Sequence, residues 1–150
     1  MAQVQALKVE ARDGTGKGPA FQARSKGLIP AVVYGGKDKP MNVSVDGRTL
    51  ERAIEAGHFL TTLFMLDGAG PKTRVIPREV QLDPVSDRPV HVDFMRLDEG
   101  ATVRLSIPVH FNGQDASPGL KKGGVLNIAR HSVSIVAPAD SIPNTIEVDV

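Results

Sequence analysis

A glycine-rich segment near the N-terminus is similar in composition to loops that bind phosphate. It reads Gly14-Thr15-Gly16-Lys17-Gly18, whereas a nucleotide-binding loop requires Gly-x-x-x-x-Gly-Lys followed by Ser or Thr. Because Gly18 occupies the place of that hydroxyl, we do not expect nucleotide hydrolysis. Glycine N–H groups and a central lysine still suit contact with the phosphates of a nucleic acid. A plain surface loop is the alternative interpretation.

His91 and Asp93 form the second group that could do chemistry. Two residues apart on a strand, they face the same side, as a general base and its orienting carboxylate would. The chain has no cysteine and no Gly-x-Ser-x-Gly nucleophile elbow, so we prefer a surface hydrogen-bonding pair. The four histidines, which also include His58, His110 and His131, lack the close spacing of zinc ligands. We therefore expect no enzyme, no metal site and no cofactor.

Charge is unevenly distributed along the 150 residues. The net charge of +1 alone argues against a nucleic-acid partner. However, residues 1–40 carry seven basic and three acidic side chains, or +4, whereas residues 97–150 carry four basic and six acidic ones, or −2. We expect any polyanion to contact the N-terminal part. No apolar run approaches the roughly 20 residues that span a bilayer, and no secretory signal is visible. This predicts a soluble intracellular protein with no membrane partner.

Alternating apolar and polar residues predict strands through most of the first 97 residues. The predicted strands are 4–12, 29–34, 41–45, 61–66, 72–82 and 90–97. Pro77 must then lie at a sheet edge or a bulge. Two short helices are predicted: 19–26, where Pro19 suits the first position and Gly27 a left-handed cap, and 49–56, with Thr49 as a possible cap.

A polar junction at 97–100 separates two β-patterned regions, so we expect one domain over 1–97 and a second over 98–150. The second contains a strand through Val103 to Val109, an Asn112-Gly113 turn, a Gly-Lys-rich loop at 119–124, and strands near 125–137 and 145–150. Because the sequence stops within an apolar alternation, we expect this all-β domain to be incomplete.

Several segments together resemble one protein family. They are GKG at 16–18, GLIPAVVYGG at 27–36, VQLDPV at 80–85 and HVDF at 91–94, followed by GGVL at 123–126 and IPNTIEVD at 142–149. The pattern is similar to that of the bacterial large-subunit ribosomal protein numbered twenty-five, in the long form also called the general stress protein Ctc family.

This resemblance implies a mainly β fold with two short helices, in which a six-stranded β-barrel is followed by a second β domain. It implies binding to the loop E region of 5S ribosomal RNA, with neighbouring large-subunit proteins and rRNA as further partners and no small-molecule substrate. The expected location is the cytoplasm, on the ribosome, in support of translation. The RNA-binding residues carried over by position are Arg12, Lys17, Arg24, Tyr34, Gln81, His91 and Asp93.

The chain departs from this family in its first helix. Where the family usually has a run of arginines, the chain has Ala20-Phe21-Gln22-Ala23, so Arg24 and Lys26 remain as the charges. Fewer phosphate contacts predict weaker binding and a shallower dependence on salt. The alternative function is a β-barrel protein-binding or stress-response module without RNA affinity of its own, which the near-neutral net charge and the acidic second half favour.

Overall fold

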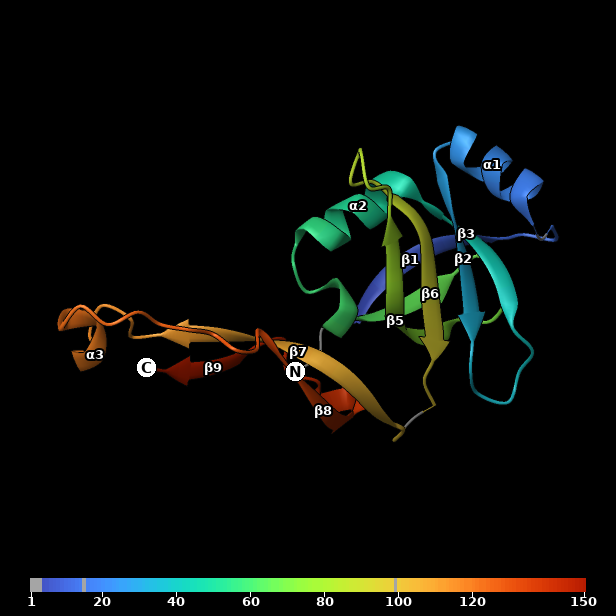
Figure 1. Cartoon of the computed structure of the whole chain (residues 1–150). Helices are drawn as coiled ribbons and strands as arrows, with labels where there is room; N and C mark the ends of the chain where they lie inside the picture. The colour runs from blue at the N-terminus through green and yellow to red at the C-terminus, as the bar shows by residue number, and fades with distance from the viewer. Residues whose placement is uncertain (1–3, 15, 99) are drawn as a thin grey trace.

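The computed structural model describes residues 4–14, 16–98 and 100–150, and it contains a β-barrel and a smaller sheet (Figure 1). The barrel is closed in the strand order β1-β3-β2-β6-β5-β4, and the smaller sheet has the order β8-β7-β9. The barrel strands are β1 (Val4–Ala11), β2 (Leu28–Tyr34), β3 (Met41–Asp46), β4 (Leu63–Asp67), β5 (Thr73–Leu82) and β6 (Pro89–Arg96). The predicted mainly β fold with a six-stranded barrel is confirmed.

Alternation along the strands explains the barrel core. Val92 and Phe94 on β6 are fully buried, whereas the intervening His91 and Asp93 lie on the outer side with part of their surface exposed. Parallel pairs β1–β4 and β2–β6 combine with antiparallel neighbours to close the barrel. Pro77 lies at a register shift between β5 and β6, as expected of a residue that cannot donate a backbone hydrogen bond.

Two helices flank the barrel at one end (Figure 1). Helix α1 (Lys17–Ser25) begins two residues before Pro19, and Gly27 takes the predicted left-handed conformation with φ 78°. Helix α2 (Gly47–Glu55) is capped by Asp46 and not by Thr49, because the Thr49 N–H donates to Asp46 Oδ2 at 2.9 Å. The predicted cap was therefore wrong by one helical turn.

The turn between α1 and β2 closely approaches the start of α2. The Gly47 N–H donates to the Gly27 carbonyl oxygen at 3.0 Å, and a Cβ on Gly47 would lie only 2.8 Å from that oxygen. A side chain at Gly47 would therefore force the end of α1 away from the start of α2. This contact fixes the relative position of the two helices.

The smaller sheet consists of β7 (Thr102–Asn112), β8 (Ser132–Pro138) and β9 (Ile146–Asp149). Strand β8 pairs with the first part of β7 and β9 with the last part. The strand predicted near 125–137 was therefore too long: residues 125–131 precede β8, and Val125 is 92% exposed. The loop predicted at 119–124 begins inside a one-turn helix, α3 (Pro118–Lys121).

The smaller sheet packs against the outer wall of the barrel. Leu63 on β4 and Ile76 on β5 are fully buried although their neighbours Phe64 and Val75 already fill the barrel core. They pack in one cluster with Leu97 and with apolar residues of the smaller sheet, namely Val103, Leu105, Ile107, Ala137, Ala139 and Ile142. Division into domains after Leu97 stays a proposal, since Leu97 itself belongs to this second cluster.

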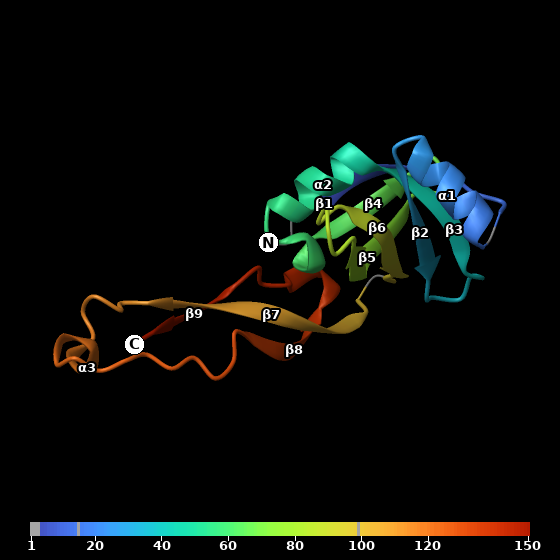
Figure 2. The same ribbon diagram turned by 45° about the horizontal axis from the view of Figure 1, so that its top comes forward.

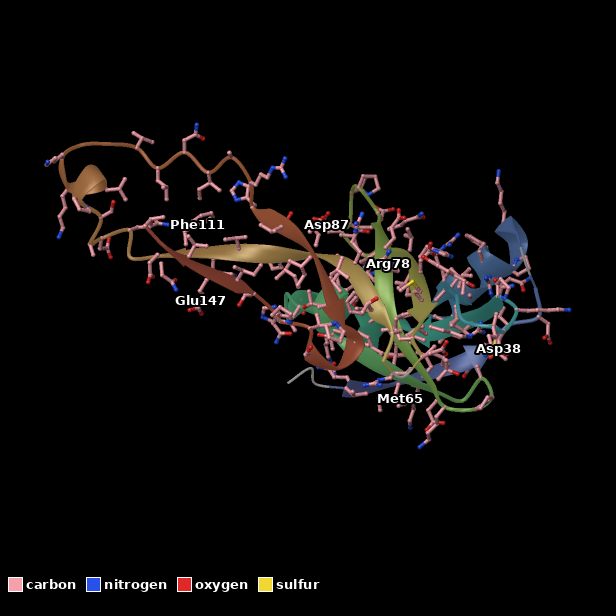
Figure 3. The ribbon with its side chains drawn as sticks, turned by 90° about the horizontal axis from the view of Figure 1, so that it is seen from below. Asp38, Met65, Arg78, Asp87, Phe111 and Glu147 are labelled. Carbon is pink, nitrogen blue, oxygen red and sulfur yellow. The ribbon has the colours of Figure 1, made fainter. Side chains whose placement is uncertain are left out.

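The far half of the smaller sheet extends from the barrel as an arm that ends at α3 (Figure 2). Phe111 on β7 and Glu147 on β9 lie on this arm, on the side of the molecule opposite Asp38 in the β2–β3 loop (Figure 3). Two short 3-10 helices, Phe59–Thr61 and Ala139–Ser141, complete the described elements. None of the helices within these residues has the length and hydrophobicity needed to cross a membrane.

Candidate nucleic-acid interface

The outer face of β6 carries the His91–Asp93 pair that the sequence singled out. His91 Nδ1 lies 3.0 Å from Asp93 Oδ1, and the two side chains are 28% and 33% exposed. This distance fits a hydrogen bond in which Nδ1–H donates to the carboxylate. The other ring nitrogen, Nε2, is then left to contact a partner, and its hydrogen-bonding role is fixed by the aspartate.

Neighbouring strands extend this polar pair into a row. Gln81 on β5 lies opposite His91, and Glu79 lies opposite Asp93. On the other side, Val32 of β2 lies opposite Asp93 and Tyr34 lies opposite Met95. Since Val33 points into the core, Tyr34 is on the outer side, and it is half-buried. We call the outer residues Tyr34, Gln81, His91 and Asp93 the sheet face.

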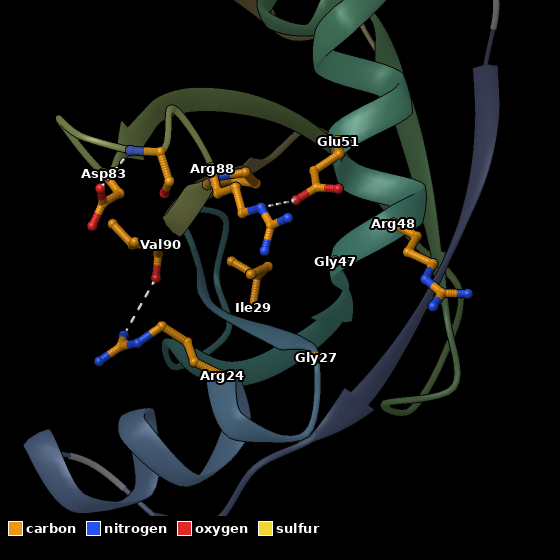
Figure 4. Close-up of a pocket in the computed structure, with 11 residues that line it drawn as sticks. Arg24, Gly27, Ile29, Gly47, Arg48, Glu51, Asp83, Arg88 and Val90 are labelled. Atoms are coloured by element: carbon orange, nitrogen blue, oxygen red, sulfur yellow. Dashed lines mark hydrogen bonds and ion pairs between the residues drawn. The ribbon is translucent and has the colours of Figure 1, made fainter.

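Arg24 connects α1 to this sheet face. Its Nη1 donates to the Val90 carbonyl oxygen at 3.4 Å, a long hydrogen bond that nevertheless brings the guanidinium to the residue preceding His91 (Figure 4). Lys17 lies seven residues before Arg24, two helical turns or about 10 Å along the axis. Both side chains are exposed, so α1 supplies cations beside the sheet face.

Arg12 differs from the other expected RNA-binding residues. It follows β1, and its backbone N–H donates to the Asn42 carbonyl oxygen at 3.0 Å. Its side chain lies at a hollow between β1 and α1 that Pro19 and Gln22 also line. Nε and Nη1 are inaccessible and meet no hydrogen-bond acceptor among the described residues. The structure therefore places Arg12 on the β1–β3 side of α1, apart from the sheet face.

The glycine-rich segment 14–18 leads into α1. Thr15 lies outside the described residues. Gly16 precedes α1 with φ 98°, a conformation that suits glycine, and contributes no side-chain cap. Lys17 itself is the first residue of the helix.

A cleft of about 450 Å³ lies between α1, the start of α2 and the β5–β6 turn (Figure 4). Arg24 and Arg88 line it from opposite sides, and Arg88 Nε lies 3.9 Å from Glu51 Oε1 on α2. Arg48, also on α2, directs its guanidinium away from Arg88. Sequence reasoning did not select Arg88, because a single arginine after a turn carries no pattern of its own.

Asp83 organises the turn that places Arg88. Its Oδ1 accepts from the backbone N–H groups of Ser86 and Val85, both at 2.9 Å. These hydrogen bonds, that from Ser86 first, hold the pKa of the Asp83 carboxyl below its ordinary value of 3.8. The carboxylate in the cleft therefore has a structural role in shaping the turn.

Arg96 is a second residue that sequence reasoning missed. Its Nη1 donates to the carbonyl oxygens of Gly35, Asp38 and Lys39 at 3.3, 3.2 and 3.0 Å. The arginine at the end of β6 thus holds the loop after β2, which carries the exposed Lys37 and Lys39. These cations follow Tyr34 and extend the positive surface beyond the sheet face.

The arrangement combines cations with mixed donors and acceptors. Exposed lysine and arginine side chains suit phosphates, while an amide, an imidazole and a carboxylate on a sheet suit base edges and hydroxyl groups. Within residues 4–14, 16–98 and 100–150, no group of three or more histidine or acidic side chains is arranged to hold a metal ion. The geometry is that of a recognition surface.

Comparisons with known proteins identify the family of the chain. Residues 7–94 match the model of the Ribosomal L25p family, and residues 102–150 match that of the C-terminal domain of ribosomal protein TL5. Proteins named large ribosomal subunit protein bL25 from Methylocella silvestris and Afipia carboxidovorans are each 53% identical over all 150 residues. One from Xanthobacter autotrophicus is 51% identical.

The chain is shorter than these relatives. It covers 66% of the Methylocella protein, 62% of the Afipia protein and 74% of the Xanthobacter protein. The matched family model nevertheless spans well over half of the chain and includes the whole sheet face. The resemblance inferred from the sequence motifs is confirmed: the chain belongs to the Ribosomal L25p family.

Proposed function

We propose that the chain is a structural constituent of the large ribosomal subunit that binds 5S rRNA at its loop E region and supports translation. The observation that carries the proposal is the row of Gln81, His91 and Asp93 across β5 and β6, with Arg24 of α1 held at its edge. Membership of the Ribosomal L25p family supports it. The same membership supports a non-enzymatic role on cytoplasmic ribosomes.

The proposed surface makes two kinds of contact with RNA: cations contact phosphates, and polar side chains contact bases and hydroxyl groups. Lys17 and Arg24, with Arg12 as a third cation, neutralise phosphates and position the protein on the RNA. Gln81 and His91 bond to base edges or 2′-hydroxyl groups, and Tyr34, which lies opposite Met95 beyond Asp93, adds a contact further along the sheet. RNA is then read mainly by its shape and the positions of its phosphates, with a few contacts to bases.

Asp93 needs a specific role because phosphates repel it. A carboxylate is useful at an RNA surface when it accepts from a base amino group or orients a neighbouring side chain. Its 3.0 Å contact to His91 supplies the second role. We therefore propose that Asp93 acts through His91, within a first domain of residues 1–97.

The second domain, residues 98–150, has a different proposed partner. It carries a net charge of −2 and presents exposed apolar side chains on its sheet, including Val133 and Val136 at 43% and 61% exposure. Such a surface suits protein better than phosphate. Neighbouring large-subunit proteins, with adjacent rRNA, are its proposed partners.

The test is a titration of the purified 150-residue chain with a loop E fragment of 5S rRNA and with a scrambled hairpin of equal length. Several salt concentrations are used, because phosphate contacts make affinity fall as salt rises. Tight, fragment-selective and salt-dependent binding is expected. Equal or negligible binding to both RNAs would exclude autonomous RNA recognition by this chain.

The second candidate is a β-barrel protein-binding or stress-response module without RNA affinity of its own. The exposed valines and acidic charge of the smaller sheet favour it. The ratio of absorbance at 260 and 280 nm of protein purified from cells separates the two. Co-purifying RNA raises the ratio and supports the first candidate, whereas a ratio typical of pure protein supports the second.

A further inference from the structure

Phe21 is exposed in a way that the fold does not explain. Its side chain on α1 is 69% exposed. By contrast, Phe59, Phe64 and Phe94 form the aromatic part of the barrel core, and Phe111 and Tyr34 are half-buried. A phenylalanine ring in water loses the stabilisation that burial provides, and its helix propensity offers no compensation. The ring is therefore accessible to a binding partner.

Helix geometry places Phe21 between two cations. Lys17, Phe21 and Arg24 are spaced i, i+4 and i+7, so they lie along one face of α1. Ala23, the buried residue of the helix, lies on the opposite face toward the barrel. The face of α1 that carries Phe21 thus presents an aromatic ring with a positive charge one turn before it and another one turn after it.

Arg24 joins this helix face to the sheet face. Its Nη1 contact with the Val90 carbonyl oxygen joins the end of α1 to β6 at the residue that precedes His91. A polyanion lying across the sheet face would therefore also meet Phe21. Lys17, Phe21 and Arg24 follow one another in line as a cation, a ring and a cation. The ligand that matches this order has a flat apolar group with a negative charge on either side of it.

We propose that Phe21 stacks on an unpaired or non-Watson–Crick base of the bound RNA, while Lys17 and Arg24 hold the phosphates on either side of it. The inference rests on the proposed function and adds a residue and a type of contact to it. Stacking between a base and an aromatic ring is strong and tolerant of sequence, because every base has a π face. Helix α1 would then contact a base through Phe21 as well as phosphates through Lys17 and Arg24.

The proposed stacking of Phe21 and the phosphate contacts of Lys17 and Arg24 differ in how they depend on salt. Stacking on a base releases no counterions, so its contribution to affinity is the same at low and high salt. The phosphate contacts of Lys17 and Arg24 instead change the slope of affinity against salt. Substitution of Phe21 should therefore lower log affinity by the same amount at every salt concentration and leave the slope of log affinity against log salt unchanged.

The experiment compares the 150-residue chain with Phe21→Ala, Phe21→Leu and Phe21→Trp variants in titrations with the loop E fragment at several salt concentrations. Leu60→Ala, which shortens an exposed side chain in the 3-10 helix Phe59–Thr61, is the matched control. We expect Phe21→Ala to weaken binding about 5- to 100-fold at every salt concentration, as loss of one stacked base does. Phe21→Leu should weaken it similarly, because leucine is apolar but cannot stack. Phe21→Trp and Leu60→Ala should bind like the wild type.

Each other outcome overturns the proposal in a distinguishable way. If the wild type does not select the fragment, the proposed function fails and this inference fails with it. If the wild type selects the fragment and Phe21→Ala binds equally well, only the stacking inference fails. Equal binding together with loss of a dimer in sedimentation of the RNA-free protein would assign Phe21 to contact with a second copy of the chain. If Phe21→Leu retains the wild-type affinity, the contact is apolar burial and not stacking, and the stacking inference fails.

Discussion

His91 Nδ1 lies 3.0 Å from Asp93 Oδ1 on the outer face of β6, and this contact links the two residues into one functional unit. The intervening Val92 is fully buried, so the strand cannot rotate either side chain away from the other without disturbing the core. The aspartate orients the imidazole, and one carboxylate oxygen of Asp93 is engaged by His91. We therefore expect each residue to affect the proposed RNA binding through the other.

The first prediction is that substitutions at His91 and Asp93 are not additive. His91→Ala removes the direct contact and should weaken binding to the loop E fragment about 5- to 10-fold, the value of one hydrogen bond of about 1 kcal/mol. Asp93→Ala should also weaken binding, although it removes a negative charge. In the His91→Ala background, the same Asp93→Ala change should have no effect or improve binding. Titrations of the four proteins give the double-mutant cycle.

Glu79→Ala provides the control for this cycle. Glu79 lies opposite Asp93 on β5 and is exposed. Its removal changes the net charge by the same amount, so it should improve RNA binding slightly. If Asp93→Ala behaves like Glu79→Ala, or if the two effects in the cycle simply add, Asp93 does not act through His91.

The second prediction concerns the charge of Arg24. Arg24→Ala should reduce the slope of log affinity against log salt by about 0.7 to 0.9, the contribution of one phosphate contact. Arg130→Ala removes an exposed arginine that precedes β8, and it should leave the slope unchanged. Titrations of both variants at four or more salt concentrations measure the slopes. A parallel downward shift of the Arg24→Ala line would instead assign Arg24 to a salt-independent contact.

The third prediction is that Arg12 lowers stability while it serves binding. Nε and Nη1 are inaccessible and have no acceptor among the described residues, and a buried donor without a partner costs about 1 to 3 kcal/mol. Arg12→Met keeps much of the length without the donors, so the free energy of unfolding in urea should rise by about 1 kcal/mol. Affinity for the loop E fragment should fall, because a cation near α1 is lost.

A fall in stability of Arg12→Met would show that the guanidinium already has the partners it needs. Arg12→Lys separates charge from shape, since lysine keeps the charge but not the planar group. Its RNA affinity should lie between those of the wild type and of Arg12→Met. Affinity equal to that of Arg12→Met would show that the guanidinium geometry is required.

Local patterns predicted the strands and the polar pair, because strand alternation depends on neighbouring residues only. His91 and Asp93 are two residues apart, so their shared face follows from the period of a strand. Arg24 and Val90 are 66 residues apart, and Arg96 and Gly35 are 61 apart. Their contacts arise only when the barrel closes. No local pattern could have placed Arg24 beside the sheet face or Arg96 beneath the loop after β2.

The error at α2 has a similar cause. Asp46-Gly47 has the composition of a turn, and the helix was expected to begin at Thr49. The structure uses Asp46 as the cap and starts the helix at Gly47, because Gly47 must approach the Gly27 carbonyl oxygen closely. The predicted strand 125–137 was too long for a similar reason, because a strand forms only where it has a partner strand to pair with. The first part of β7 is already paired with residues 132–138.

The last prediction tests the Asp46 cap and its dependence on pH. Asp46 Oδ2 accepts from the Thr49 hydroxyl at 2.7 Å and from the Thr49 N–H at 2.9 Å. These hydrogen bonds, the hydroxyl first, hold the pKa of Asp46 below its ordinary value of 3.8. Asp46→Ala should reduce the free energy of unfolding by about 0.5 to 2 kcal/mol at neutral pH, as loss of a cap does.

Asp46→Asn separates the charge from the cap, because asparagine also accepts the backbone hydrogen bond. A carboxyl whose pKa is lower in the folded state stabilises the fold at pH values above its unfolded pKa, near 3.8. This stabilisation is lost as the pH falls through the folded pKa. The wild type should therefore exceed Asp46→Asn in stability at pH 7, and the difference should shrink as the pH falls from 7 to below 3.8. Urea unfolding of both proteins across this range measures the difference, and a constant gap would mean that the charge of Asp46 does not stabilise α2.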